Sequence, residues 1–485
     1  MRPTVIAMGS ATNQPFVHPH RSLPDCQIAR LPDCQIADLP YPYLMLTAAD
    51  NETLTQVGPG TLMGNLLRRY WMPALLSNEI AEPDSPPVRA RILGEDLVAF
   101  RDTNGAAGVF VQACPHRGAS LFFGRNEEAG LRCVYHGWKF DTAGACVDMP
   151  SEPAESNFKT KVRVTAYPTR ESGGIIWAYL GPPEKRPPFR DFGADALAPD
   201  QQRASKVRVE CNWVQSMEGN LDTSHISWLH QFHAAADIPD DGTDTPGVPS
   251  NAMSIRIWEH DRAPRIEVSD EWYGYRYAGL RSTPKGNTHV RVTAYIFPFT
   301  TVVAAIPLGI GAGGGLFVPI DDTACWRFGL TVQPPVHQRP EHIGAPLFSQ
   351  MPYGFERPDN GISPRGFSAA NDYQVDREVQ RTTSFSGIPD FVSQDHAVQE
   401  SMGARLDRTR EHLGTSDRAV IRMRQLLVSA ARDLAEGIAP PALEDGDYVR
   451  IYGAERILTA GQDWRDLGTD NDPIFDIAEA QPVRT

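Results

Sequence analysis

The chain has 485 residues, 41% of them hydrophobic, and a formal net charge of -14 at pH 7. At roughly 100 to 200 residues per domain, this length predicts about two or three domains with hydrophobic cores. The acidic balance and the lack of a Lys/Arg run argue against a nucleic acid, an acidic protein or an anionic membrane as partner. Seven cysteines, an odd number in a large chain, are not typical of a disulfide-stapled secreted domain, so we expect a reducing cytoplasm.

The first 44 residues differ in composition from the rest of the chain. They contain one repeat, "LPDCQIAR" at 23–30 followed directly by "LPDCQIAD" at 31–38. Two copies of a short unit are too few for a solenoid, and the surrounding Pro, His, Gln and Ser predict a disordered tail over residues 1–44. Cys26 and Cys34 have no partners at ligand spacing, so we expect no metal there.

From residue 45 the pattern changes to short helices and then short strands. Residues 45–75 have a helix-like start, with breakers at 58–60. Residues 87–113 are rich in strand formers on either side of the turn signal Asn104-Gly105. A Pro-rich stretch at 183–199 is typical of a linker, so a second domain is expected to begin near residue 205.

The second domain is predicted to combine helices with many strands. Residues 217–232 look helical and residues 255–326 look strand-like. The uncharged stretch 301–320 is nearly long enough to span a bilayer, but its glycines and prolines favour a strand–turn–strand in a buried sheet. A second helix is expected over 416–434, where apolar residues repeat every three to four positions and Ser416 is the predicted N-cap.

The segment "CPHRGASLFFGRNEEAGLRCVYHGWKF" holds two cysteine–histidine pairs, Cys114-x-His116 and Cys133-x2-His136, separated by sixteen residues. Thiolates and imidazoles bind soft or borderline metals, so these four side chains could hold either zinc or an iron–sulfur cluster. A zinc finger normally opens with two nearby cysteines, whereas each half here supplies one Cys and one His. That mixed set is what a Rieske 2Fe-2S cluster needs, with two cysteines on one iron and two histidines on the other.

Three further expectations follow from a Rieske cluster. Gly118 and Gly137, beside the ligands, let the backbone approach the cluster closely. The two histidines should lie toward the surface, because an electron donor must reach them. Cys146 has no place in the pattern and is expected to be a packed core thiol.

A second group of metal-ligand residues lies in "EGNLDTSHISWLH", which contains Asp222, His225 and His230. Two histidines and one distant carboxylate form the facial triad that holds non-haem Fe(II) with open positions for O2. Asp222 and His225 would share one helix face, whereas His225 and His230 would lie about 140° apart around an ideal helix. Both histidines can reach one iron only if the helix is distorted, and we predict the distortion between Ser227 and Leu229.

Together with "SQDHAVQESMGARLDRTREHLGTSD" at 393–417, these two motifs resemble the oxygenase component (alpha subunit) of the Rieske non-haem iron aromatic ring-hydroxylating oxygenases of the phthalate 4,5-dioxygenase type. The resemblance runs from about Met45 to about residue 435. It implies an α+β fold, with a Rieske-type β-domain and a catalytic domain that has an antiparallel sheet and helices of the helix-grip type. The expected division is a tail at 1–44, a Rieske domain with its N-terminal segment at 45–200, a catalytic domain at 201–440 and a C-terminal extension at 441–485.

The resemblance also implies a role for each site residue. The 2Fe-2S ligands would be Cys114, His116, Cys133 and His136. The mononuclear Fe(II) ligands would be His225, His230 and Asp395, of which spacing alone could not have chosen the aspartate. The nearby histidines His233 and His396 are not expected to be ligands.

Asp222 would have a catalytic role that involves two subunits. By resemblance, it would bridge His225 on its own chain and His136 on a neighbouring chain, in a homotrimer or stacked trimers. Electrons would come from a separate flavin and iron–sulfur reductase, since no G-x-G-x-x-G opens a helix in this chain. The nearest match, "GIGAGGG" at 309–315, lacks the helix and the downstream acid.

The implied reaction is the hydroxylation of an aromatic, carboxylated substrate with O2, as ring dihydroxylation or as oxidative O-dealkylation or ether cleavage in aromatic catabolism. A substrate carboxylate would need an arginine clamp, for which Arg265 and Arg281 are the candidates, with a sheet-edge salt bridge as the alternative. The competing interpretation is a Rieske electron-transfer protein without oxygenase activity. It requires the 222–230 motif to be accidental.

Overall fold

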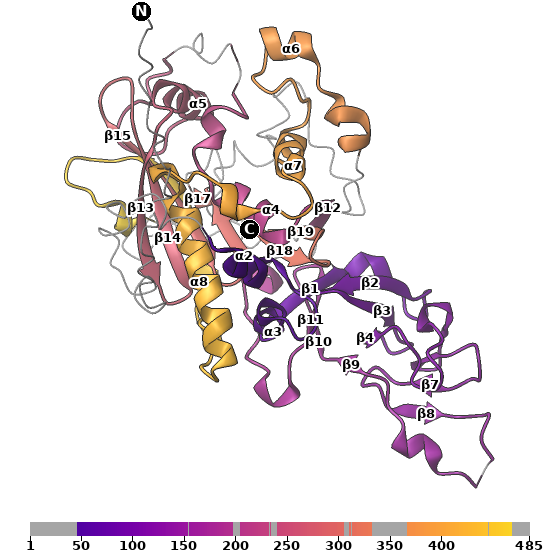
Figure 1. The fold of residues 1–485 in the computed structure, drawn as a ribbon. Helices are drawn as coiled ribbons and strands as arrows, with labels where there is room; N and C mark the ends of the chain where they lie inside the picture. Colours follow the sequence, from indigo (N-terminus) through magenta and orange to yellow (C-terminus); the bar gives the residue numbers. More distant parts are fainter. Residues whose placement is uncertain are drawn as a thin grey trace, which may run out of the picture. The chain divides into compact units, whose positions relative to one another are not determined.

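The computed structural model of the protein describes residues 46–153, 155–196, 204–231, 233, 240–304, 310–311, 313–331, 366–444 and 446–467. All of them belong to one compact unit, Leu39–Thr485. The predicted disordered tail, with Cys26 and Cys34, lies outside the described residues. The fold is α+β, as the resemblance implies, with antiparallel sheets and helices packed against them (Figure 1).

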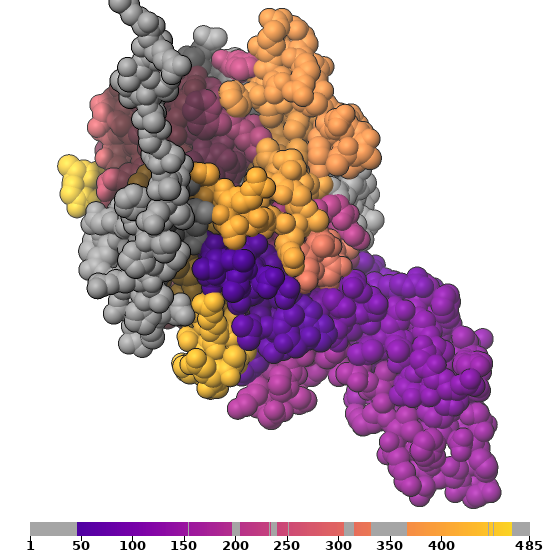
Figure 2. All heavy atoms as spheres, viewed as in Figure 1, coloured from indigo at the N-terminus to yellow at the C-terminus, as the bar shows by residue number. Residues whose placement is uncertain are grey.

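Two short helices open the described chain, α2 (Ala48–Thr55) and α3 (Leu62–Leu67). Each begins after a threonine, Thr47 or Thr61, whose hydroxyl accepts a backbone N–H of the first turn. The predicted breakers at 58–60 separate the two helices, and Gly60 has the positive φ (+84°) that favours glycine. Both helices pack against α8 (Arg418–Ala435), as the neighbouring indigo and yellow atoms in Figure 2 show.

Three small antiparallel sheets follow. The three-stranded sheet has the order β1-β11-β10 and consists of β1 (Trp71–Leu76), β11 (Ile175–Tyr179) and β10 (Thr169–Ser172). The first four-stranded sheet consists of β2 (Val88–Ile92), β3 (Glu95–Arg101), β4 (Ala107–Val111) and β9 (Ala166–Tyr167). The second consists of β5 (Arg125–Glu127), β6 (Gly130–Arg132), β7 (Lys139–Phe140) and β8 (Cys146–Asp148).

The predicted turn at Asn104-Gly105 joins β3 to β4. The Asp102 carboxylate accepts the backbone N–H groups of Asn104 (2.9 Å) and Ala106 (2.8 Å), and Gly105 has a positive φ. Side chains from both four-stranded sheets meet in one buried core. Its members are Val98, Phe100, Phe110, Cys114, Leu121, Leu131, Cys133, Trp138, Phe140, Cys146, Met149 and Val164. Two predicted cluster ligands are therefore part of this core.

The second half of the chain builds a nine-stranded antiparallel sheet, whose main path is β12-β19-β18-β16-β15-β14-β13. The strands are β12 (Ala204–Val209), β13 (Arg265–Glu271), β14 (Gly274–Ser282), β15 (Thr288–Ile296), β16 (Thr300–Val303), β17 (Ile310–Gly311), β18 (Gly313–Pro319), β19 (Cys325–Thr331) and β20 (Gly453–Ile457). The uncharged stretch 301–320 contributes to β16, β17 and β18, which confirms the predicted strands in a sheet. Residues 305–309, which join β16 to β17 and would hold the predicted turn, lie outside the described residues. Strand β20, from the predicted C-terminal extension, pairs with β15 and β17.

Helices pack on this sheet, and α8 runs beside β13 and β14 in Figure 1. Helices α4 (Trp213–Leu221) and α5 (Asn251–His260) also contact its strands, whereas α7 (Phe391–Ser401) packs against α4 and follows α6 (Arg377–Thr382) in the chain. Helix α8 confirms the predicted helix, but it begins at Arg418, after a 3-10 turn at Thr415–Asp417, so its N-cap is Asp417 and not Ser416. Among the described residues, no helix has both the length and the apolar character needed to cross a membrane.

Candidate metal centres

The two cysteine–histidine pairs lie on two loops with the same backbone pattern. In the first, Cys114 N–H donates to Ala119 O (2.8 Å) and Gly118 N–H donates back to Cys114 O (2.9 Å). In the second, the Cys133 N–H donates to Trp138 O (2.8 Å), and the glycine N–H at 137 donates back to Cys133 O (2.9 Å). Both glycines have positive φ, 75° and 77°, so a side chain at either would be strained. The loops therefore hold their ligand residues in matching positions.

The loops bring the four predicted cluster ligands together. The rings of His116 and His136 are 4.4 Å apart between centroids, and His116 also stacks on Trp138 at 4.3 Å. Burial raises the pKa of Cys114 to about 11; the backbone N–H of His116 opposes this shift and the nearby Cys133 thiol adds to it. The two cysteines are buried and the two histidines are half-buried, which confirms the prediction that the histidines lie nearer the surface.

The donor set fits a 2Fe-2S cluster better than one zinc ion. His136 Nδ1 is buried and has no hydrogen-bond partner in the described part of the chain, as expected of a nitrogen reserved for a metal. Within that part, these four side chains do not make up a group able to hold one ion, whereas a cluster needs its ligands on two separate irons. Cys146 is buried nearby and its thiol donates to Asp148 O (3.4 Å), so it is a core residue as predicted.

The second motif does not form one helix. Helix α4 ends at Leu221, Asp222 is extended (φ -87°, ψ 122°), and a separate 3-10 turn spans His225–Ser227. The prediction of a helix over 217–232 is therefore wrong beyond 221, since the chain turns where the Asp222 carboxylate accepts the Ser224 N–H (2.6 Å). The predicted distortion is present: Trp228, with φ -129° and ψ -70°, leaves the helical region between the two histidines.

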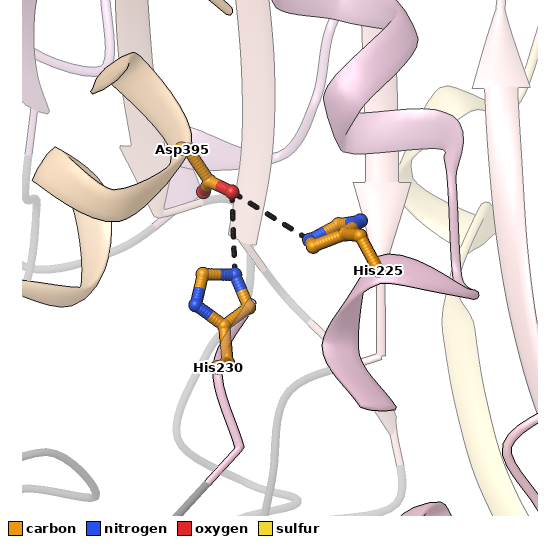
Figure 3. A group of neighbouring side chains, drawn as sticks. All are labelled: His225, His230 and Asp395. Carbon is orange, nitrogen blue, oxygen red and sulfur yellow. Dashed lines mark ion pairs between the residues drawn. The ribbon is translucent and has the colours of Figure 1, made fainter. Parts of the chain in front are cut away.

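Three side chains from two distant segments converge in one place (Figure 3). One ligand atom from each of His225, His230 and Asp395 lies within 4.8 Å of the other two. Asp395 Oδ1 is 3.6 Å from His225 Nε2 and 3.2 Å from His230 Nε2. His230 Nε2 is buried without a hydrogen-bond partner among the described residues. Two imidazole nitrogens and one carboxylate oxygen, with no fourth ligand-type side chain from the described part of the chain, fit a facial non-haem iron site.

The charges around this group keep the Asp395 carboxylate ionised. Burial alone would raise the pKa of Asp395, but the charges of His230, His225 and Arg327 outweigh it and hold that pKa well below its usual range. Burial lowers the pKa of His225, whereas Asp222 and Asp395 raise it, and the net shift is upward. Asp395 is therefore an anion across the physiological range, as a ligand of iron must be.

Asp222 lies behind His225 rather than in the ligand group. Its Oδ2 is 3.6 Å from His225 Nδ1, the nitrogen on the opposite side of the ring from Asp395. Its side chain is 33% exposed, so another molecule can reach it. Burial raises the pKa of Asp222, but hydrogen bonding and the charge of His225 lower it more. A carboxylate in this position orients the imidazole and makes it a better donor.

The other predicted candidates have different outcomes. His233 is exposed and its Nε2 lies 2.9 Å from Gln380 O, outside the metal group. His396 is buried on the same helix as Asp395, and it is not part of that group either. Arg265 forms a salt bridge with Glu267 on β13, the last strand of the sheet's main path, which is the alternative that the sequence left open.

Arg281 is buried and turned toward the second motif. Its Nη2 donates to Thr223 O (2.7 Å) and its Nε donates to Asp261 O (3.2 Å). Burial, then the charge of Arg291, lowers the pKa of Arg281 to about 10. Its Nη1 is buried with no hydrogen-bond partner in the described residues. Arg281 thus holds the turn beside Asp222 and keeps one donor free.

Sequence reasoning missed two residues beside the metal group. The charge of Arg291, on β15, acts on His225. Gln394 Oε1 lies 2.7 Å from His230 Nδ1. The alternation of strand β15 and the adjacency of Gln394 to Asp395 were visible in the sequence, but neither shows which way the side chain points.

Comparison with known proteins agrees with this geometry. Residues 70–168 match the family model "Rieske [2Fe-2S] domain", and residues 178–482 match "LigXa C-terminal domain like". The chain is 38% identical to the phthalate 4,5-dioxygenase oxygenase subunit of Pseudomonas putida, over 87% of this chain and 94% of the relative. It is 36% identical to the 3-chlorobenzoate-3,4-dioxygenase oxygenase subunit of Comamonas testosteroni, over 87% of this chain and 97% of the relative.

Solved structures support the same fold. The crystal structure of dicamba monooxygenase bound to dicamba matches with a TM-score of 0.51 at 19% identity, over 76% of this chain and 99% of that one. Oxygenase components of this family work with a separate ferredoxin or reductase. The chain belongs to the Rieske non-haem iron oxygenases, as an oxygenase (alpha) subunit of the phthalate 4,5-dioxygenase type, an enzyme with a Rieske 2Fe-2S cluster and a mononuclear iron.

Proposed function

We propose that the chain is the terminal oxygenase that hydroxylates an aromatic carboxylate, with electrons from a separate NAD(P)H-dependent reductase. The observation that carries the proposal is the convergence of His225, His230 and Asp395 from two distant segments of a chain that also has two cysteine–histidine loops. An electron-transfer protein needs the loops alone. The three converging side chains have no use in it.

In this proposal each metal has its own ligand set. The cluster ligands are Cys114, His116, Cys133 and His136, and the mononuclear iron ligands are His225, His230 and Asp395. When bound, the cluster supplies single electrons and the mononuclear iron supplies the activation of O2. The corresponding domains are a Rieske domain at 45–200 and a catalytic domain at 201–440, with the extension at 441–485.

Asp222 connects the two centres across a subunit boundary in this proposal. It orients His225 from behind and hydrogen-bonds His136 of a neighbouring copy. The partial exposure of both Asp222 and His136 supports this role, since each leaves a polar side chain accessible from outside its own chain. Such head-to-tail contacts close into a ring, and we propose a homotrimer or stacked trimers.

The substrate class is proposed from two arginines, of which Arg281 is buried and Arg291 is half-buried. Arg281 Nη1 and Arg291 Nε are both buried with no hydrogen-bond partner among the described residues. The charges of both act on Tyr277, and that of Arg291 also acts on His225. A guanidinium that keeps one donor nitrogen unused, close to the iron ligands, is suited to receive a carboxylate. The two most similar relatives named above act on phthalate and 3-chlorobenzoate, which both carry a carboxylate on an aromatic ring.

The proposed enzyme could catalyse one of two reactions, ring dihydroxylation or oxidative O-dealkylation. A 5,5'-dehydrodivanillate O-demethylase oxygenase subunit from Sphingobium sp. is 30% identical over 82% of this chain. A tert-butanol monooxygenase oxygenase subunit from Aquincola tertiaricarbonis is 33% identical over 84%. A panel of substrates must therefore include phthalates, chlorobenzoates, methoxybenzoates and an uncharged alcohol.

The test is anaerobic purification, followed by iron and sulfide analysis and single-turnover product detection over that panel. About three irons and two sulfides per chain, with a hydroxylated or demethylated carboxylate as product, are expected. About two irons and no turnover, even after iron is added back, would leave an electron-transfer protein. Arg291→Met should raise KM for the carboxylate without removing the third iron; an unchanged KM would refute the assignment of the carboxylate to Arg291.

A further inference from the structure

One face of α7 contacts His230 on three sides. Phe391 stacks on the imidazole, with 3.7 Å between ring centroids and 18° between ring planes. Gln394 Oε1 is 2.7 Å from Nδ1, and Asp395 Oδ1 is 3.2 Å from Nε2. Positions i, i+3 and i+4 share one face of a helix, so the first turns of α7 can supply all three contacts together. Helix α7 therefore fixes both the plane of the ring and its rotation.

The orientation of the Gln394 amide is itself fixed by a second hydrogen bond. Its Nε2 donates to Ile388 O (2.8 Å), which leaves only the carbonyl oxygen to face His230. A carbonyl oxygen accepts and cannot donate, so His230 must carry its proton on Nδ1. The lone pair of the neutral ring then lies on Nε2, the nitrogen next to Asp395. The hydrogen-bond network, rather than an observed hydrogen, assigns this tautomer.

The same glutamine joins His230 to the segment before α7. Ile388 lies in that segment, shortly before α7. Two backbone hydrogen bonds join the segment to the residues around His230: Phe385 N–H donates to Gln231 O and His233 N–H donates to Thr383 O (2.9 Å each). Gln394 is 4% exposed, so both of its bonds are shielded from water. An ionised carboxylate at this position could accept from His230 but could not donate to Ile388 O.

We propose that Gln394 is a positioning residue that holds His230 as the Nδ1–H tautomer and presents its Nε2 to the iron. The inference rests on the proposed function, in which His230 is a ligand. It also distinguishes the two histidines: His225 has a carboxylate behind it and His230 has a neutral amide. Of the two histidines, only His225 then has an anion next to its Nδ1, the partly exposed carboxylate of Asp222.

The test measures Fe(II) binding rather than turnover. The mononuclear iron is removed with a chelator while the Rieske visible spectrum is kept intact, and Fe(II) is returned by anaerobic equilibrium dialysis. Gln394→Met, which keeps the shape but neither hydrogen bond, should weaken Fe(II) binding by about 10- to 100-fold. Gln394→Glu keeps the acceptor for His230 and should bind within about threefold of the wild type. The matched control is Gln399→Met, a buried glutamine on the same helix whose side chain lies against Gly219, which should not change the affinity.

The outcomes separate the inference from the proposed function. If His230→Ala and Asp395→Ala still bind the third iron, the proposed iron site is wrong. If both lose it while Gln394→Met binds like the wild type, the positioning role of Gln394 is wrong. If Gln394→Glu binds as weakly as Gln394→Met, the glutamine acts by holding Ile388, and the tautomer argument fails. Should Gln394→Met not fold, Gln394→Glu still decides, because a tenfold loss there contradicts the inference.

Discussion

Glu218 on α4 is the centre of a buried ionic network, and its removal should destabilise the whole catalytic half of the protein. Its two carboxylate oxygens accept from Arg408 at 3.0 and 2.9 Å and from Arg424 Nε at 2.6 Å. The Arg408 side chain is fully buried and that of Arg424 is 4% exposed. Glu411 also accepts from Arg424, whereas Arg408 forms an ion pair with no carboxylate other than Glu218 among the described residues.

The substitution Glu218→Gln keeps the volume and removes the charge. One amide N–H group would then face a guanidinium N–H, and one buried guanidinium would lose its counter-ion. Breaking a buried pair in this way costs about 3 to 5 kcal/mol. At about 2 to 4 °C per kcal/mol for domains of 150 to 250 residues, Tm should fall by on the order of 10 °C.

The measurement is thermal and urea unfolding followed by circular dichroism. The matched control is Glu378→Gln, which removes an exposed pair with Arg381 on α6 and should cost less than about 1 kcal/mol. Equal losses for the two variants would refute the argument that burial makes Glu218 costly to remove.

The same carboxylate predicts a pH dependence. Burial raises the pKa of Glu218, but the two guanidiniums lower it more, so the folded-state pKa lies below the ordinary value of 4.5. The stability from this group is fully present above pH 4.5 and is lost as the pH falls through the lowered value. The difference in Tm between wild type and Glu218→Gln should therefore be constant above about pH 5 and shrink below it. A difference that grows in acid would contradict the sign.

Three other predictions concern the metal centres. Gly137→Ala should lower the 2Fe-2S content more than Gly118→Ala. Both glycines have positive φ, but only a Cβ at 137 would meet another described atom, Pro150 Cγ at 2.7 Å. Equal visible absorbance per chain in the two variants would contradict this prediction. Asp222→Asn should keep the iron content and slow reoxidation of the Rieske cluster in single turnover by at least about tenfold, and an unchanged rate would remove Asp222 from the electron path. Cys133→Ser should abolish the Rieske visible spectrum, whereas Cys146→Ser should keep it. Loss of the spectrum in both variants would show that the cluster needs the Cys146 thiol too.

The sequence by itself determined the chemistry of the two centres. Thiol and imidazole pairs at fixed spacing predict a Rieske cluster because only a few side chains bind iron, and the loops that carry them are short and local. Local patterns likewise predicted helix α8, the turn at Asn104-Gly105 and the strands in 301–320. Each of these depends on neighbours within a few residues, which is the range over which capping, turn geometry and periodicity act.

Only the tertiary structure decided which distant residues meet. Spacing could not select Asp395 from many carboxylates, and it could not show that Gln394 faces His230, because α7 comes more than 160 residues after the second histidine. The helix predicted over 217–232 was too long because a carboxylate at 222 turned the chain instead of continuing it. Side-chain direction and long-range contact are set by packing of the sheet and its helices, and that packing energy belongs to no single stretch of sequence.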